Sequence, residues 1–141
     1  MRHAVRHRLL IVTTVPETLV TILGDQPRFL SQNFDVQLVT SQGAFFDLLL
    51  DEGVPVHVVN MNRRINLIKD FVSLLNMLLL FCRIRPDIVH SYTPKAGFLA
   101  MLAAFLCRVP VRVHTFTGLI WPTAKGLRKK LLMAMDRLLC M

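Results

Sequence analysis

The sequence predicts an α/β domain with a doubly wound, mostly parallel, Rossmann-like sheet. Short runs rich in Val, Ile, Leu and Thr alternate with longer stretches of helical periodicity, which is the pattern of βαβ units. Hydrophobic residues make up 53% of the chain and charged residues 18%, a balance that excludes a disordered protein. The 141 residues suffice for one sizeable core and are too few for two ordinary domains. We therefore treat residues 1–141 as one domain.

The boundaries of the predicted elements follow from local signals. Gly53 ends one short helix, and Pro86 stops a long one. The second and third strands are apolar enough to be buried on both faces. Segment 17–32 is less regular, because Gly24 and Pro27 favour a loop followed by a helix. The expected strands are Leu9–Val15, Val36–Thr40, Val54–Val59, Asp87–His90 and Val111–Thr115, and the expected helices are a helix from about Asp25, then Ala44–Glu52, Asn66–Ile84, Pro94–Cys107 and Lys125–Leu139.

The charge balance predicts an anionic partner. Seventeen Lys and Arg against nine Asp and Glu give a net charge of +8, and from Arg108 onward seven basic residues face only Asp136. Nucleic acid is disfavoured, because no nucleic-acid module is present and the basic residues are not interleaved with stacking aromatics. An anionic membrane surface or a phosphorylated lipid agrees better with the mean hydropathy of +0.48.

No segment predicts export, membrane spanning or metal binding. The longest apolar stretches, Phe71–Cys82 and Ala96–Cys107, are shorter than the ~20 residues that span a bilayer. The basic, then apolar, amino terminus lacks a cleavage site, so we interpret it as the first strand and expect a cytoplasmic protein. The three cysteines are far apart in apolar surroundings, which favours buried thiols over disulfides or a metal site.

Candidate functional residues follow the predicted strands, since ligands of open parallel sheets bind beyond the carboxyl ends of the strands. The fourth strand is followed by the motif HSYTPKAG, residues 90–97. Thr93 is placed to cap a helix that begins at Pro94, which leaves backbone N–H groups beside Lys95 for an anion. The alternative is a well-capped turn in which Lys95 is merely solvated.

Two further side chains stand at strand exits. His114 ends the fifth strand and precedes a flexible turn with Thr117 and Gly118; the alternative is a structural histidine bonded to backbone. Glu17 follows the first strand and is placed to accept a hydrogen bond from a sugar hydroxyl; the alternative is a carboxylate favoured by the start of a helix.

Basic groups supply candidate contacts to phosphate or membrane. Arg63 and Arg64 follow the third strand and are suited to bidentate phosphate binding, although paired arginines are often only solvated. The last helix has a basic face that is either an ordinary exposed surface or a membrane contact. Its residues are Lys125, Arg128, Lys129 and Lys130.

Several motifs are absent. The first strand is not followed by G-x-G-x-x-G, so a dinucleotide-binding Rossmann domain is disfavoured despite the topology. Neither a P-loop nor a Ser-His-Asp order is present. A nucleotide-binding or regulatory Rossmann-like module therefore rests on topology alone and ranks last.

The motifs HSYTPKAG and VPVRVHTFTG, together with the opening LLIVTTVPETL, resemble the amino-terminal domain of family 4 glycosyltransferases of the GT-B type, in the subgroup that builds capsule, O-antigen and related lipid-linked polysaccharides. The resemblance implies that this domain binds a lipid-linked sugar acceptor, while a second domain binds the nucleotide-sugar. It implies a metal-independent, usually retaining transfer without a cofactor. By position it implies a cleft role for His114, as the catalytic residue, and acceptor contacts from Thr14, Glu17, Tyr92, Thr93, Lys95, Thr117 and Gly118.

The sequence departs from the family pattern on the donor side. The family's donor domain carries two glutamates spaced eight apart, whereas the glutamates here are Glu17 and Glu52. We therefore expect an incomplete enzyme that is peripheral to the cytoplasmic face of the membrane and inactive alone. Three hypotheses follow: an acceptor-binding half completed by a donor-domain partner chain, a non-catalytic truncated remnant or membrane-associated interaction subunit, and the Rossmann-like module above.

Overall fold

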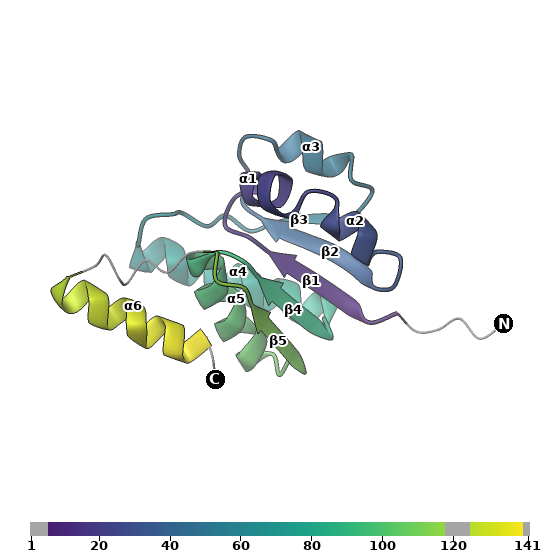
Figure 1. The fold of residues 1–141 in the computed structure, drawn as a ribbon. Helices are drawn as coiled ribbons and strands as arrows, with labels where there is room; N and C mark the ends of the chain where they lie inside the picture. Colours follow the sequence, from purple (N-terminus) through teal and green to yellow (C-terminus); the bar gives the residue numbers. More distant parts are fainter. Residues whose placement is uncertain (1–5, 118–124, 140–141) are drawn as a thin grey trace.

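The computed structural model describes residues 6–117 and 125–139, which contain a five-stranded parallel sheet (Figure 1). The strand order is β3-β2-β1-β4-β5, and every neighbouring pair is parallel. The doubly wound, Rossmann-like α/β fold predicted from the sequence is confirmed. The strands are β1 (Arg8–Val12), β2 (Asp35–Thr40), β3 (Val56–Val58), β4 (Ile88–Ser91) and β5 (Val111–His114).

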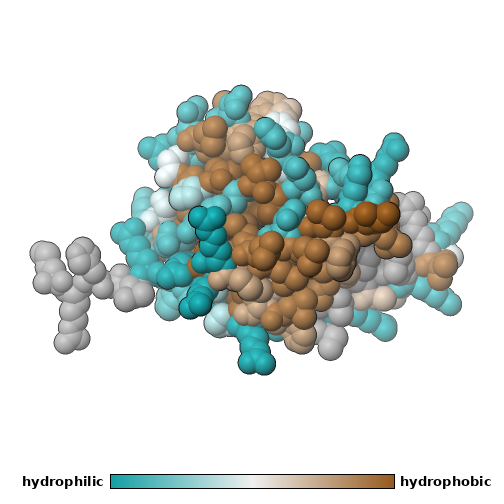
Figure 2. Space-filling model, turned by 180° about the vertical axis from the view of Figure 1, so that it is seen from behind, coloured by the Kyte–Doolittle hydropathy of each residue, from teal (hydrophilic) through white to brown (hydrophobic). Residues whose placement is uncertain are grey.

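Helices cover both faces of the sheet. One layer holds α1 (Pro16–Thr18), the π-helical turn η1 (Leu19–Leu23), α2 (Gln26–Leu30) and α3 (Phe46–Leu50). The other layer holds α4 (Leu67–Ile84) and α5 (Pro94–Leu106), and α6 (Gly126–Leu139) contacts α5. From the side on which α4 lies, a broad part of the surface is apolar (Figure 2).

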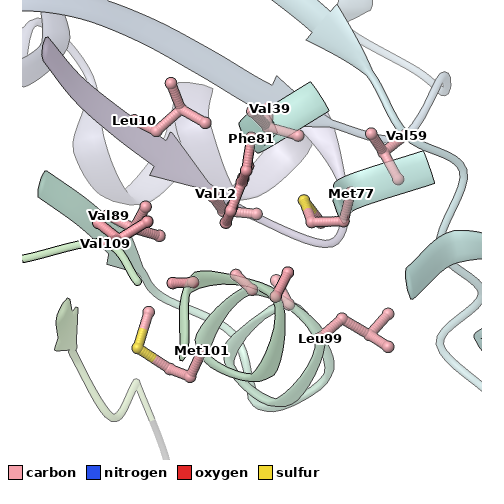
Figure 3. Close-up of a cluster of buried hydrophobic side chains, with 14 of the residues drawn as sticks. Leu10, Val12, Val39, Val59, Met77, Phe81, Val89, Leu99, Met101 and Val109 are labelled. Atoms are coloured by element: carbon pink, nitrogen blue, oxygen red, sulfur yellow. The ribbon is translucent and has the colours of Figure 1, made fainter. Parts of the chain in front are cut away.

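The core is two clusters, one on each side of the sheet. Alternating residues of β1 point to opposite faces, so Leu10 belongs to the cluster under α4 and α5, and Ile11 to the cluster under η1 and α3. Figure 3 shows the first cluster, in which Met77 and Phe81 of α4 point toward the sheet and Leu99 comes from α5. The central strand is thus buried on both faces.

The long helix α4 has a defined start and end. Asn66 caps it by accepting a hydrogen bond from the Lys69 N–H at 3.0 Å. Arg85 adopts a left-handed conformation (φ 53°) at its end, immediately before Pro86. The predicted helix Asn66–Ile84 is confirmed, except that Asn66 is its cap and Leu67 its first helical residue.

The expected loop before residue 25 is wrong. Residues 16–23 form α1 and the π-helical turn η1, whose Leu19 and Leu23 are buried against the sheet. Gly24 does interrupt the helical backbone, with φ 49°. Pro27 does not, because it lies in the first turn of α2, where its missing N–H has no helical partner to lose. Burial of Leu19 and Leu23 thus stabilises helical backbone up to the break at Gly24.

The third strand is not buried on both faces as its sequence predicts. β3 is an edge strand of three residues, and Val58 is 46% exposed. Its apolar pattern is that of a central strand, but the strand order leaves one edge without a partner. β3 lies at the edge because the chain crosses over after it and continues on the far side of β1. The residue pattern of β3 carries no information about that crossover.

The cysteines also differ from expectation. Cys82 is exposed, Cys107 is half-buried, and their sulfurs lie 3.7 Å apart. Partial burial and the neighbouring Cys82 thiol raise the pKa of Cys107 to about 11. Cys140 lies outside the described residues.

Residues 6–117 and 125–139 contain neither a membrane-spanning helix nor a metal-type cluster of side chains. No helix there is both long and apolar enough to cross a bilayer. No three His, Cys, Asp or Glu side chains in these ranges are grouped as metal ligands would be.

The two faces of α4 predict opposite responses to truncation. Met77 is fully buried, whereas Leu79 on the same helix is 70% exposed. We expect Met77→Ala to lower the free energy of unfolding by about 2–5 kcal/mol, because it leaves a cavity. Leu79→Ala is the matched control and should change it by less than about 0.5 kcal/mol. Urea denaturation of both variants checks this, and equal losses would contradict the assignment of the two faces.

Candidate functional site

The carboxyl ends of all five strands meet at one edge of the sheet, and a cleft of about 710 Å³ opens there. It lies between the exits of β1, β2 and β3 and the first half of α4. Carboxylate, amide, hydroxyl and basic groups share its wall with four apolar side chains. The polar and charged residues are Glu17, Ser41, Gln42, Asn60, Asn62, Arg63, Lys69, Ser73 and Asn76.

Two serines hold the wall of the cleft in shape. The Ser41 hydroxyl accepts from the Met61 N–H at 2.7 Å and donates to the Met61 carbonyl at 3.1 Å. The Ser73 hydroxyl, from α4, donates to the Asn60 carbonyl at 2.5 Å. These bonds fix the chain after β3, so that Asn60 and Asn62 border the cleft.

Glu17 is the acidic residue of the cleft. It lies in α1 directly after the β1 exit, half-buried. Among the described residues, its Oε2 is buried without a hydrogen-bond partner. A buried carboxylate oxygen of this kind usually accepts a hydrogen bond, so Glu17 keeps an unused acceptor beside the cleft that it lines.

The neighbouring part of the edge, between β1 and β4, is closed by internal contacts. The Thr14 N–H donates to Thr93 Oγ1 at 3.0 Å, and the two hydroxyl oxygens lie 2.6 Å apart. The Ala96 N–H, in the first turn of α5, donates to Thr14 Oγ1 at 3.2 Å. Thr93 is the N-cap residue by conformation, but its side chain makes no capping bond. The hydroxyl that caps α5 therefore comes from the β1 exit.

Lys95 makes an ion pair and a hydrogen bond inside the domain. Its Nζ lies 2.6 Å from Asp70 Oδ1 and donates to the Arg64 carbonyl at 2.8 Å. Both charged side chains are mostly buried, at 15% and 18% exposed. The pair joins the first turns of α4 and α5, so Lys95 is held by Asp70 and is not merely solvated.

His114 is packed beside the start of α5. Its Nδ1 lies 2.8 Å from Ser91 Oγ, and its ring meets Phe116 edge to face at 4.5 Å. A Cβ on Gly97 would overlap the ring, at 2.7 Å from Nδ1. Gly97 is therefore required so that the imidazole can lie against the helix.

Tyr92 and His90 form a stacked pair at the same place. Their ring centroids lie 4.2 Å apart, and the Tyr92 hydroxyl is 3.2 Å from His90 Nδ1. Tyr92 is 6% exposed, and Thr117 Oγ1 donates to its carbonyl at 3.0 Å. Burial, and then the nearby His114, hold the pKa of His90 below its ordinary value of 6.5. Burial thus favours a neutral His90.

The structure thus divides the residues predicted from the sequence into groups. Glu17 and Arg63 border the cleft, and the exposed Arg64 follows Arg63. A second group gathers around the start of α5: Thr14, Tyr92, Thr93, Lys95, His114 and Thr117. Of the basic residues near α6, Lys125 and Lys130 are exposed and Lys129 is partly buried. Gly118 and the side chain of Arg128 lie outside the described residues.

Sequence reasoning missed much of the cleft wall. Gln42 follows β2, a strand whose exit was not among those expected to carry ligand-binding residues, and Lys69 and Asn76 lie on α4. Asn60 and Asn62 follow β3 and were visible as polar residues at a strand exit. The spacing of Lys69, Ser73 and Asn76 also indicated the polar side of a helix. It did not indicate that this side faces the exits of β1, β2 and β3.

A family model, the glycosyl transferase 4-like domain, matches residues 23–141. The chain belongs to this family. This match confirms, over most of the chain, the family resemblance seen in the strand-exit motifs.

Two curated proteins are similar in sequence. The capsular polysaccharide biosynthesis glycosyltransferase CapM of Staphylococcus aureus is 36% identical over 127 residues, which cover 90% of this chain and 33% of that protein. The UDP-Gal:alpha-D-GlcNAc-diphosphoundecaprenol alpha-1,3-galactosyltransferase of Escherichia coli is 35% identical over 102 residues, covering 72% of this chain and 26% of that protein. The chain thus matches a third or less of the length of each.

Solved structures share the fold. UDP-N-acetylglucosamine 2-epimerase from Rickettsia bellii matches with a TM-score of 0.70 at 14% identity, over 94% of this chain and 37% of that one. Anabaena Alr3699/HepE in complex with UDP matches with a TM-score of 0.68 at 16% identity, over 93% of this chain and 34% of that one. At these identities the likeness concerns the fold alone.

The contact between Gly97 and His114 predicts that Gly97→Ala changes stability in opposite directions with and without the His114 ring. Gly97→Ala should destabilise the glycosyl transferase 4-like domain by about 1–3 kcal/mol, because the new methyl group displaces the imidazole ring. In a His114→Ala background the ring is gone, and the same substitution should stabilise the helix by up to ~1 kcal/mol. Urea unfolding of the four proteins of this double-mutant cycle measures the coupling. Additive effects of the two substitutions would disprove the contact.

Proposed function

We propose that this domain is the acceptor-binding part of a glycosyltransferase that moves a sugar from a nucleotide-sugar to a lipid-linked saccharide. The observation that carries the proposal is a cleft lined by the Glu17 carboxylate and four amide side chains. Family membership supports the reaction class. The similar E. coli protein is named for transfer to GlcNAc-diphosphoundecaprenol, which supports the lipid-linked acceptor.

The chemistry of the cleft suits a saccharide. A carboxylate beside amides such as Asn60 and Asn76 offers acceptors and donors to vicinal hydroxyl groups. The volume of about 710 Å³ falls in the range of ~300–1,000 Å³ usual for small-ligand sites. Arg63 and Lys69, which also line the cleft, add positive charge that would stabilise the diphosphate of a lipid-linked sugar.

His114 has a different part in the proposal. It lies at the same edge of the sheet, across β1 and β4 from the cleft. The sequence resemblance implies that it corresponds to the cleft histidine of the family. We propose that it contacts the transferred sugar when a donor domain faces this edge. Its packing against Ser91 and Gly97 would hold the imidazole in one orientation for that contact.

The donor side belongs to the part of the relatives that this chain does not match. The proposed nucleotide-sugar site lies on a second domain, in the same polypeptide or in a partner chain, together with the basic groups that neutralise the leaving diphosphate. That neutralisation is worth several kcal/mol of the barrier, so residues 1–141 alone would transfer no sugar. The proposal includes a peripheral location at the cytoplasmic face of the membrane, where a lipid-linked acceptor is held.

The Glu17 carboxylate is the first test of the cleft. Glu17→Gln removes the charge but keeps the shape, and should weaken binding of a short-chain, water-soluble prenyl-diphosphate GlcNAc about tenfold. Glu52→Gln is the matched control, because Glu52 follows α3 at the opposite end of the sheet. Titration calorimetry measures both. Unchanged affinity in Glu17→Gln, or an equal loss in the control, would overturn the placement of the acceptor.

The second test concerns transfer. Residues 1–141 incubated with the same acceptor and a set of UDP-sugars should yield no glycosylated product by mass spectrometry. The same residues joined to, or mixed with, the second domain should yield it. Product from residues 1–141 alone would contradict the proposed division of labour.

A further inference from the structure

Two cysteine side chains meet where helices α4 and α5 end. Cys82 lies in the last turn of α4, and Cys107 is the C-cap residue of α5. Their sulfur atoms lie 3.7 Å apart, although the two residues are 25 positions apart in the sequence. At this distance the two free thiols are in van der Waals contact. A disulfide bond of ~2.05 Å would require the sulfurs to approach by only roughly 1.7 Å.

The ends of the two helices hold these thiols in place. The Arg85 N–H donates to the Phe81 carbonyl at 2.7 Å, which closes the last turn of α4. The Cys107 N–H donates to the Ala103 carbonyl at 2.9 Å, which does the same for α5. The Cys107 thiol donates to the Leu78 carbonyl of α4 at 3.8 Å, so its sulfur lies against α4. The native packing therefore brings the two sulfurs together before any bond forms between them.

The two thiols differ in their access to solvent. Cys82 is exposed, whereas Cys107 is half-buried. Partial burial, and then the neighbouring Cys82 thiol, raise the pKa of Cys107 to about 11, so this thiol stays protonated at neutral pH. The thiolate is the nucleophile in thiol–disulfide exchange. Cys82 is therefore placed to react first with a small molecule, and Cys107 to react second with Cys82.

A surface hollow of about 440 Å³ opens beside the pair, at the end of the sheet opposite the cleft. Both cysteines line it, together with the exposed Arg85 and Arg108. The carboxylate that also lines it, Asp87, accepts a hydrogen bond from the Arg8 N–H at 2.8 Å. The excess of positive charge attracts a small disulfide that carries carboxylates, and the hollow gives it access to the exposed thiol.

We propose that Cys82 and Cys107 are a site of reversible oxidation, at which a carboxylate-bearing, low-molecular-weight disulfide is reduced and an intramolecular disulfide forms between α4 and α5. The Cys82 thiolate attacks one sulfur of the small disulfide, whose S–S bond breaks, and the released half takes up a proton. Cys107 then gives its proton to water and attacks the Cys82 sulfur, which releases the second half as a thiol. Two electrons pass from the protein to the small disulfide, whose halves leave with the two protons that the cysteines lose. An excess of thiol reverses both steps.

The new bond ties the C-terminal end of α4 to that of α5. It encloses residues 82–107 in a covalent loop and reduces the conformational freedom of the unfolded chain, so the oxidised domain is the more stable one. Neither cysteine lines the cleft. Oxidation therefore needs neither the cleft nor an acceptor.

Thiol–disulfide exchange tests the proposal on the 141-residue chain carrying Cys140→Ser, which leaves Cys82 and Cys107 as its two thiols. The chain is incubated with glutathione disulfide, alkylated with iodoacetamide and analysed by mass spectrometry. It should lose the mass of two hydrogen atoms, take up no alkyl group and yield a peptide pair linked through the two cysteines. Excess dithiothreitol should restore both thiols. Disulfide-linked dimers as the main product would overturn the proposal.

Single substitutions in the same chain separate the two roles. Cys107→Ser should retain one glutathione on Cys82, because no second thiol is present to displace it. Cys82→Ser should react roughly tenfold or more slowly, since its remaining thiol is half-buried and protonated. The opposite order of rates, or a mixed disulfide that persists in the chain with both cysteines, contradicts the proposed roles.

Mixtures of reduced and oxidised glutathione distinguish a built site from two cysteines that merely share a chain. At equilibrium the ratio of closed to open chain should be about tenfold or more higher for the folded chain than for the chain in urea, because packing holds the sulfurs together. By the same thermodynamic cycle, closure should raise the melting temperature by roughly 5 °C or more.

The matched control for this measurement is Cys82→Ser, whose melting temperature glutathione disulfide should not change. Melting of each chain before oxidation shows that it is folded. Equal closed-to-open ratios in the folded and urea-unfolded chains, or an unchanged melting temperature after closure, would overturn the proposal.

Discussion

The pairing of β4 with β1 is the constraint on which the rest of this structure depends. After β3 the chain passes through α4 to the other face of the sheet, and β4 returns to the free edge of β1. The exits of β1 and β4 then lie side by side. Thr14 meets Thr93 and caps α5, although the two threonines are 79 residues apart in sequence. Without this crossover α5 would lack its cap from Thr14, and α4 would not border the cleft.

The length of the connections explains why one half of this edge is closed and the other open. Residues 92–93 alone separate β4 from α5, and the absence of a side chain on Gly97 lets His114 lie against the helix. Residues 59–66 separate β3 from α4. This longer connection borders the cleft, which Glu17 also lines.

Helix α4 serves two surfaces at once. Its inner side supplies Met77 and Phe81 to the core, and its outer side exposes a second apolar row. Only the inner side is needed for the domain to fold, since burial of one stripe is enough to hold a helix on a sheet. The outer row therefore accounts for part of the high mean hydropathy without adding to the core.

The sequence by itself determined the α/β class, most helix and strand positions and the family, because periodicity, capping residues and the strand-exit motifs are local. It also marked Glu17 and Arg63 as polar residues at strand exits. The tertiary structure decided which residues meet: Lys95 with Asp70, Thr14 with the first turn of α5, and α4 with the exits of β1 to β3. It likewise decided that β3 is an edge strand and that residues 16–23 are helical. These outcomes depend on strand order and on burial against distant segments, and a local pattern specifies how a segment folds but not which segment it packs against.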